Sequence, residues 1–196
     1  MNTVTVKSYT EPPFSEKEIL RYAGVREADE AIYSLLSSCI NEARGALSYK
    51  VCYCETDVNS DDRKCDFGFF TAGSKSLAKN LKGCHKAIIF AATVGIGIDR
   101  LIAKYSRISP SRALMLQAIG AERIEALCDA FCYDIEKEKG TKLRPRFSAG
   151  YGDAPLDLQK DIFRILNAPK NIGISLGDSM LMSPTKSVTA FIGIEK

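Results

Sequence analysis

The chain has 196 residues, of which 45% are hydrophobic and 26% charged, and this predicts a single globular domain over residues 1–196. The formal net charge is only +3, which does not indicate nucleic acid or an acidic membrane surface as a partner. No apolar run approaches the roughly 20 residues that span a bilayer, and residues 1–13 lack the apolar core of a secretory signal, so we expect a cytoplasmic protein.

Two helices are predicted near the N-terminus. Ser15 followed by Glu18 forms a capping box for a short helix that ends near Gly24. Residues 28–43 then repeat apolar side chains at helical spacing. We expect both helices to cover a sheet.

The next segments predict strands and a short helix. Residues 47–58 alternate as a strand, and residues 66–72 are predicted to form a second strand. The polar residues 59–62 between them are typical of an antiparallel connection. Residues 74–81 predict a short helix, and residues 86–93 predict a buried apolar strand.

A glycine turn follows the strand of residues 86–93. Gly95 and Gly97 precede a helix predicted near residues 98–105, an arrangement that also binds nucleotide phosphates and adenosyl ligands in doubly wound folds. Arg100 replaces the third glycine of the dinucleotide fingerprint, and no acidic residue closes a second strand at the required distance. We therefore favour a tight structural turn that starts the helix over a nucleotide site.

The longest predicted helix covers residues 112–137. Its inward stripe is predicted to be Leu116, Ile119, Ile124, Leu127 and Phe131. An acidic face on the same helix consists of Glu122, Glu125 and Asp129. We interpret this face as solvated and assign it no chemistry.

The C-terminal part of the chain predicts one helix and two strands. The helix covers residues 155–166, and the strands cover residues 179–182 and 187–194. Together the elements predict one α+β domain with a mixed, mainly antiparallel sheet flanked by helices.

Seven cysteines and one histidine, His85, could indicate a metal site or a reactive thiol. No C-x-x-C pair is present, so a zinc or iron–sulfur site is not predicted. Cys84 and His85 are adjacent at the entrance to a strand and point to opposite faces, which disfavours a Cys–His pair. We expect most cysteines to be small buried residues, and the chemistry to come from bound cofactors.

The most informative stretch is residues 146–151, Arg-Phe-Ser-Ala-Gly-Tyr. Arg146 offers a planar fork of donors that matches a carboxylate, and Gly150 lets the backbone approach a ligand closely. Pro145 and Pro155 flank the motif and exclude a helix or a long strand. The motif predicts a pocket for a carboxylate beside a flat ring system, against the alternative of an ordinary surface turn with a solvated arginine.

This motif resembles the R-x-x-x-G-Y signature of the reactivation domain of cobalamin-dependent methionine synthase, which binds S-adenosylmethionine. Two further elements follow in the family's order, the amphipathic segment 156–166 and the stretch 173–190 with its Gly-Ile-Ser-Leu-Gly-Asp-Ser sequence. The resemblance covers about residues 143–195, and the segments upstream look like the short, free-standing members of the family.

The resemblance implies a binding site for S-adenosylmethionine. The residues carried over by the family's motifs are Arg146, Phe147, Ser148, Ala149, Gly150, Tyr151, Asp178 and Ser179. Arg146 would hold the methionyl carboxylate, and Tyr151, in the catalytic position, would lie where the ligand meets the corrin. Ile192 stands where the family has an aromatic residue, so that contact with adenosine is absent.

The resemblance also implies partners. The D-x-H-x-x-G element that grips cobalamin is missing, because His85 is the only histidine. We therefore expect cobalamin to arrive on a cobalamin-dependent methionine synthase that lacks its own reactivation domain, with flavodoxin or a similar protein as electron donor. The alternative is a non-catalytic module that docks onto a corrinoid protein.

Overall fold

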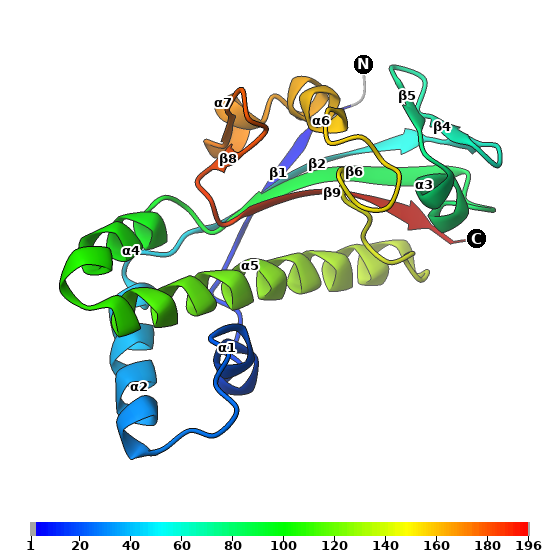
Figure 1. Cartoon of the computed structure of the whole chain (residues 1–196). Helices are drawn as coiled ribbons and strands as arrows, with labels where there is room; N and C mark the ends of the chain where they lie inside the picture. The colour runs from blue at the N-terminus through cyan, green and yellow to red at the C-terminus, as the bar shows by residue number, and fades with distance from the viewer. Residues whose placement is uncertain (1–2, 196) are drawn as a thin grey trace.

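A computed structural model describes residues 3–195 and places a four-stranded antiparallel sheet at the centre of the chain (Figure 1). The strand order is β1-β2-β6-β9, with every neighbouring pair antiparallel. The strands are β1 (Thr5–Tyr9), β2 (Tyr49–Asp57), β6 (Lys86–Thr93) and β9 (Ser187–Ile194). The predicted α+β fold with a mainly antiparallel sheet is confirmed.

The neighbouring strands β6 and β9 are the elements that the sequence predicted most closely. β6 and β9 have the predicted bounds, because nearly all of their side chains are buried and apolar. β1 was not predicted. It lies at the edge of the sheet, where its side chains alternate between half-buried and exposed, and its short Thr-Val-Lys-Ser-Tyr sequence has no apolar run.

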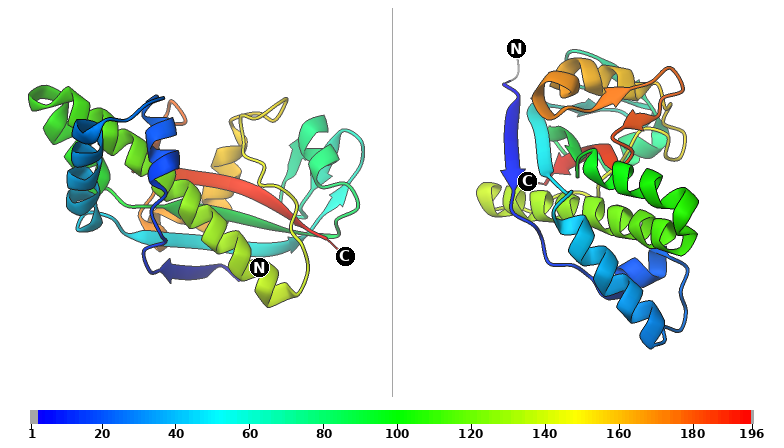
Figure 2. Two further views of the ribbon diagram at one scale, coloured as in Figure 1. Left: turned by 90° about the horizontal axis from the view of Figure 1, so that it is seen from below. Right: turned by 90° about the vertical axis from the view of Figure 1, so that its left-hand side faces the viewer.

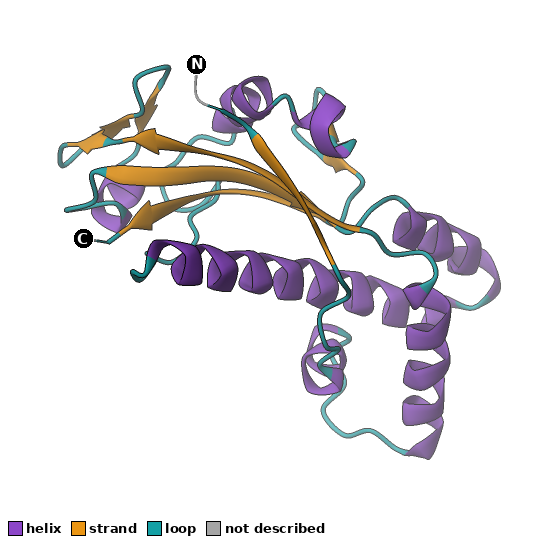
Figure 3. Cartoon of the chain, turned by 180° about the vertical axis from the view of Figure 1, so that it is seen from behind, coloured by secondary structure: helices purple, strands orange, loops and turns teal. Residues whose placement is uncertain are grey.

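One face of the sheet is covered by α5 (Pro110–Lys139), with α4 (Gly97–Ile108) beside it. The predicted inward stripe of α5 is buried throughout. The helices α1 (Glu16–Tyr22) and α2 (Glu30–Arg44) pack mainly against α5 (Figures 2 and 3). The expectation that they cover the sheet is therefore wrong, because α5, with 30 residues, already occupies that face over about 45 Å.

The predicted start of α1 is confirmed by its cap, and α2 begins two residues later than predicted. Ser15 Oγ accepts a hydrogen bond from the Glu18 backbone N–H at 3.4 Å, and α1 ends just before Gly24. Asp29 caps α2 in the same way, because its Oδ1 accepts from the Ile32 N–H at 2.9 Å.

The opposite face carries several short elements around a second core. They are α3 (Lys75–Asn80), α6 (Leu158–Leu166), α7 (Ala168–Ile172), the three strands β3 (Asn59–Ser60), β4 (Lys64–Asp66) and β5 (Thr71–Gly73), and the hairpin β7 (Ser175–Leu176) and β8 (Met182–Ser183). The sheet thus separates two cores. The face to which a strand residue's side chain points decides which core it joins.

The strand predicted over residues 66–72 is wrong. β4 ends at Asp66, whose Oδ1 accepts a hydrogen bond from the Gly68 N–H at 2.9 Å. Gly68 has a φ of 82°, so the chain turns there and β5 begins only at Thr71. Aromatic residues of this segment stack within the turn, with the ring centroids of Phe67 and Phe70 4.9 Å apart.

The strand predicted over residues 179–182 is also wrong for most of its length. Only Met182 belongs to β8. The preceding residues form the hairpin loop, in which the Gly177 N–H donates to the Leu181 carbonyl at 2.9 Å and Met180 has a φ of 62°. A left-handed residue cannot continue a strand.

The cysteines and the helices give two further observations. All seven thiols are free and six are buried, which confirms their interpretation as small buried residues. Within residues 3–195, no group of His, Cys, Asp and Glu side chains could hold a metal ion. No helix in the same range is long and apolar enough to cross a membrane.

The glycine turn between β6 and α4 lets the backbone that precedes β2 pack closely against it. Gly95 has a φ of 83°, and a Cβ on Gly97 would lie 2.0 Å from the Ala46 carbonyl oxygen. The backbone before β2 therefore fills the space beside Gly97, which confirms the structural interpretation of the turn.

We predict that Gly97→Ala lowers the free energy of unfolding by about 2–3 kcal/mol, because the oxygen that it meets belongs to the backbone and cannot swing aside. Urea unfolding measures the effect. Gly45→Ala is the matched control, since Gly45 has a φ of −73° and open space around the added methyl. Equal urea midpoints for the two variants would contradict the prediction.

Candidate functional site

The signature begins as an extension of the sheet. The Phe147 N–H donates to the Phe191 carbonyl at 2.9 Å, and the Phe191 N–H returns a bond to the Phe147 carbonyl at 2.8 Å. Upstream, the Arg144 N–H donates to the Gly193 carbonyl at 2.8 Å. Successive side chains on this segment therefore point to opposite faces. Arg146 turns toward α5, whereas Phe147 packs into the core on the other face.

Arg146 makes two ion pairs with α5. One terminal nitrogen lies 2.6 Å from Asp129 Oδ1 and the other 2.7 Å from Glu125 Oε2. Burial alone lowers the pKa of the Arg146 guanidinium, but the hydrogen bond to Asp129 and the interactions with Cys128 and Cys132 together outweigh it and raise the pKa above its ordinary value. The interpretation of Glu125 and Asp129 as a merely solvated face is wrong, because the face is where the signature arginine binds.

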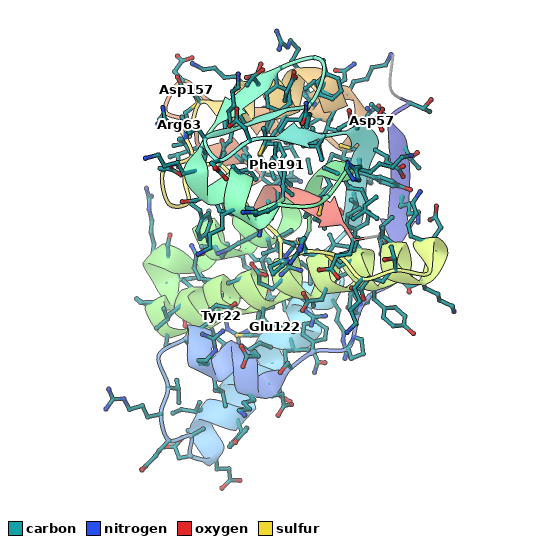
Figure 4. All side chains as sticks on the ribbon, turned by 90° about the vertical axis from the view of Figure 1, so that its right-hand side faces the viewer. Tyr22, Asp57, Arg63, Glu122, Asp157 and Phe191 are labelled. Atoms are coloured by element: carbon teal, nitrogen blue, oxygen red, sulfur yellow. The ribbon has the colours of Figure 1, made fainter. Side chains whose placement is uncertain are left out.

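A hollow of about 660 Å³ lies beside these ion pairs, between α5, α1 and the segment that precedes α1. Its lining residues are Pro12, Pro13, Ser15, Glu18, Tyr22, Glu122, Glu125, Ala126, Asp129, Ala130 and Tyr133. Figure 4 shows Tyr22 and Glu122 where α1 meets α5. The hollow combines apolar walls with four carboxylates, and two of these, Glu125 and Asp129, pair with Arg146, which does not itself line the hollow.

A buried ion pair holds one wall of the hollow in place. Arg123 is fully buried and pairs with its neighbour Glu122. The remaining Arg123 donors reach the carbonyls of Pro12 and Pro13 at 2.5 and 2.7 Å, and Glu122 Oε1 accepts from the Ser15 N–H at 3.1 Å. Glu122 is therefore buried, and its interpretation as part of a solvated acidic face is wrong.

Burial and pairing act against each other on Arg123. Burial alone lowers the pKa of its guanidinium, but the hydrogen bond to Glu122, the charge of Glu122 and the interaction with Tyr49 together outweigh it and raise the pKa above its ordinary value. The guanidinium also lies 3.8 Å from the centre of the Phe14 ring. The sequence signal for this anchor is a Glu-Arg pair in an otherwise apolar stripe.

The rest of the signature forms a tight turn. The Tyr151 N–H donates to the Ser148 carbonyl at 3.3 Å, and the Gly150 N–H donates to the Ala154 carbonyl at 3.1 Å. Gly150 has a φ of 88°, which favours glycine. Ala149 is buried in the core on the α3 face, whereas Tyr151 is 68% exposed.

Asp153 fastens this turn to α3, and sequence reasoning missed it. The Ser74 hydroxyl donates to Asp153 Oδ1 at 2.6 Å, and the N–H groups of Lys75 and Ser76 donate to the carboxylate at 2.8 and 3.0 Å. These hydrogen bonds, that from Ser74 above all, hold the pKa of Asp153 well below its ordinary value. Asp153 accepts from N–H groups at the start of α3 although it lies 77 residues away from Ser76. No local sequence pattern indicates such a contact.

Asp178 and Ser179 lie elsewhere. Both are exposed in the loop of the β7–β8 hairpin, and the residues of that hairpin pack into the core on the face opposite α5. The structure therefore does not bring them to Arg146.

Comparison with known proteins supplies the family. A family model for the activation domain of vitamin B12 dependent methionine synthase matches residues 76–196. No curated protein matches the chain. A solved structure, described as the crystal structure of the MetH reactivation domain bound to AdoHcy, matches with a TM-score of 0.70 and 13% identity. The match covers 98% of this chain and 78% of that chain. At this identity, it shows that the two share a fold.

We predict that Asp153→Asn lowers the urea midpoint at neutral pH. A carboxyl group with a lowered pKa in the folded state stabilises the fold above its ordinary pKa of about 3.9, and that contribution is lost as the pH falls further. The difference from the wild type should therefore stay constant from about pH 7 to 5 and shrink below about pH 4.

Asp157→Asn is the control for this experiment, because the Asp157 side chain (Figure 4) does not cap α6. A pH-independent difference for Asp153→Asn would show that the charge of Asp153 contributes nothing to the turn.

Proposed function

The chain belongs to the family of activation domains of vitamin B12 dependent methionine synthase, and from this premise we propose that it binds S-adenosylmethionine and supports the reductive remethylation of cobalamin carried by a partner. The observation that carries the proposal is the position of Arg146. Its guanidinium pairs with Glu125 and Asp129, which line a hollow of about 660 Å³, a volume typical of small-molecule sites.

The chemistry of the hollow matches the parts of S-adenosylmethionine. The fork of Arg146 suits the methionyl carboxylate. Glu125 and Asp129 suit the ammonium group, and the proline and tyrosine side chains of the N-terminal wall offer apolar surface to the adenine ring. The matched solved structure is described as holding AdoHcy, the thioether that remains when S-adenosylmethionine has given up its methyl group.

Within the signature, we assign different tasks to different residues. Arg146 binds the ligand, Phe147 and Ala149 anchor the segment in the core on the α3 face, and Ser148 and Gly150 shape the turn. Tyr151 is the exposed end of that turn and is our choice for the residue that faces the corrin. Asp178 and Ser179 we place on the surface that meets the partner.

Bound cobalamin supplies a cobalt nucleophile that accepts the methyl group. The contribution of this chain is to hold the methyl donor in a fixed orientation, which accounts for a large part of the rate in such transfers. We propose that a methionine synthase without its own reactivation domain carries the cobalamin and that flavodoxin or a similar protein supplies the electron, in the cytoplasm.

We predict that Arg146→Ala weakens binding of S-adenosylmethionine by about 2–4 kcal/mol, because a partly desolvated carboxylate loses its charged partner. Arg146→Lys should restore little, since an ammonium group cannot make the bidentate contact. Calorimetric titration measures both.

The control for Arg146 is Arg164→Ala, which removes an arginine that pairs with Asp161 on α6. Equal affinity for wild type and Arg146→Ala would remove Arg146 from the site. A wild-type chain that binds a corrinoid protein but no S-adenosylmethionine would favour the non-catalytic docking module.

We predict that Tyr151→Phe leaves binding of S-adenosylmethionine nearly unchanged and that Tyr151→Ala slows remethylation more than it weakens binding. The reason is the exposed ring at the end of a rigid turn, where it can order the space between donor and corrin. Single-turnover formation of methylcobalamin under a strong reductant reports the rate. Equal losses of rate and affinity in the Ala variant would make Tyr151 a binding contact only.

A further inference from the structure

We infer that Lys186 is a modification site, at which small acyl phosphates acylate the side-chain amine. Lys186 lies between the β7–β8 hairpin and β9, one residue before that strand begins. None of the tasks assigned to the signature involves this lysine. Its support, its surroundings and the charge that faces it favour acylation independently of the proposed function.

Gly120 makes room for the Lys186 side chain. A glycine in the interior of a helix is unfavourable, and one that occurs there usually has a packing reason. Gly120 lies in the interior of the 30-residue α5, and a Cβ at this position would lie 2.9 Å from both Cγ and Cε of Lys186. The aliphatic stem of Lys186 therefore lies flat across the helix.

Hydrogen bonds fix the backbone from which this stem starts. The Val94 N–H donates to the Lys186 carbonyl at 3.1 Å. Thr185 donates to the Asp99 carboxylate twice, through its N–H at 2.8 Å and through its hydroxyl at 2.6 Å. The Lys186 side chain therefore begins at a fixed point between β6 and α4, and Gly120 sets its direction.

The ammonium group of Lys186 is partly removed from water and has no ion-pair partner within residues 3–195. The lysines that do form ion pairs in that range are Lys7, Lys86, Lys104, Lys139 and Lys160. Burial lowers the pKa of the Lys186 ammonium, and the charge of Asp99 on α4 opposes this effect in part. The element packed against the stem, α5, contributes the uncharged Gly120. At a given pH, a larger fraction of Lys186 is therefore uncharged than of a fully solvated lysine.

The uncharged amine is the nucleophile in acyl transfer. Its nitrogen forms a bond to the carbonyl carbon of the acyl phosphate, the bond from that carbon to the bridging oxygen breaks, and phosphate leaves with the electron pair. The amine proton goes to water. The product is an uncharged amide, so acylation removes the cation that faces Asp99. Because Lys186 is only half-buried, a small donor can reach its nitrogen.

The experiment treats the whole chain with acetyl phosphate and follows acetylation of each lysine by peptide mass spectrometry. The rate for each lysine is divided by its rate in the chain unfolded by guanidinium chloride, which removes differences in local sequence and in detection. Lys170, an exposed residue of α7, is the control. It reports any effect of the denaturant on the reagent itself.

We expect Lys186 to react several-fold faster in the folded chain than in the unfolded chain, and Lys170 to react at similar rates in both. The rate for Lys186 should also level off at a lower pH in the folded chain than in the unfolded chain, because the fold lowers its pKa. A difference in accessibility alone would not move that pH. A folded rate for Lys186 equal to or below its unfolded rate would overturn the inference.

Two substitutions test the geometry in opposite directions. Gly120→Ala places a methyl group against the flexible stem of Lys186 and pushes the amine into water, so we expect Lys186 to slow toward its rate in the unfolded chain. Asp99→Asn removes the charge that opposes the lowered pKa, so Lys186 should react faster. Gly45→Ala, which has open space around the added methyl, should leave the rate unchanged. No change in either test variant, or a change in the same direction in both, would overturn the inference.

Discussion

The buried pair of Glu122 and Arg123 is the interaction on which the candidate site depends. Removing two charges from water is expensive, and such a pair persists only when hydrogen bonds satisfy its remaining atoms. Here they come from the carbonyls of Pro12 and Pro13 and from the Ser15 N–H. The N-terminal segment is thereby fixed on α5, so that the hollow has two walls. Loss of either charge would leave the other buried and unpaired, which would lower the free energy of unfolding by about 3–5 kcal/mol.

The extended start of the signature, which pairs with β9, is the second constraint on the site. Hydrogen bonding to β9 fixes the backbone of Phe147, and strand geometry then sends neighbouring side chains to opposite faces. Arg146 meets the carboxylates of α5, while Phe147 anchors the segment in the other core. One structural device therefore sets both the position of the cation and the rigidity of its support. The turn beyond it is held separately, by Asp153 on α3.

Signals that are local in the sequence predicted the fold well, and signals that depend on distant partners did not. The cap at Ser15 and the buried strands β6 and β9 could be predicted because each depends on a few consecutive residues. Within the candidate site, Arg146 was predicted from its motif. Its carboxylate partners were not predicted. An acidic helix face has the same sequence pattern whether it contacts water or an arginine 17 or 21 residues away. The hairpin at Asp178 was assigned to the site from its resemblance to the family's motif, which says nothing of the face on which it lies.

The ion pairs of Arg146 also bear on how tightly a ligand can bind. The two carboxylates orient the guanidinium in advance, which reduces the ordering that a ligand must impose. They also mean that a ligand carboxylate exchanges one charged partner for another, so the net gain is the difference between two similar interactions. This exchange favours moderate affinity, which would suit the proposed role in reactivation.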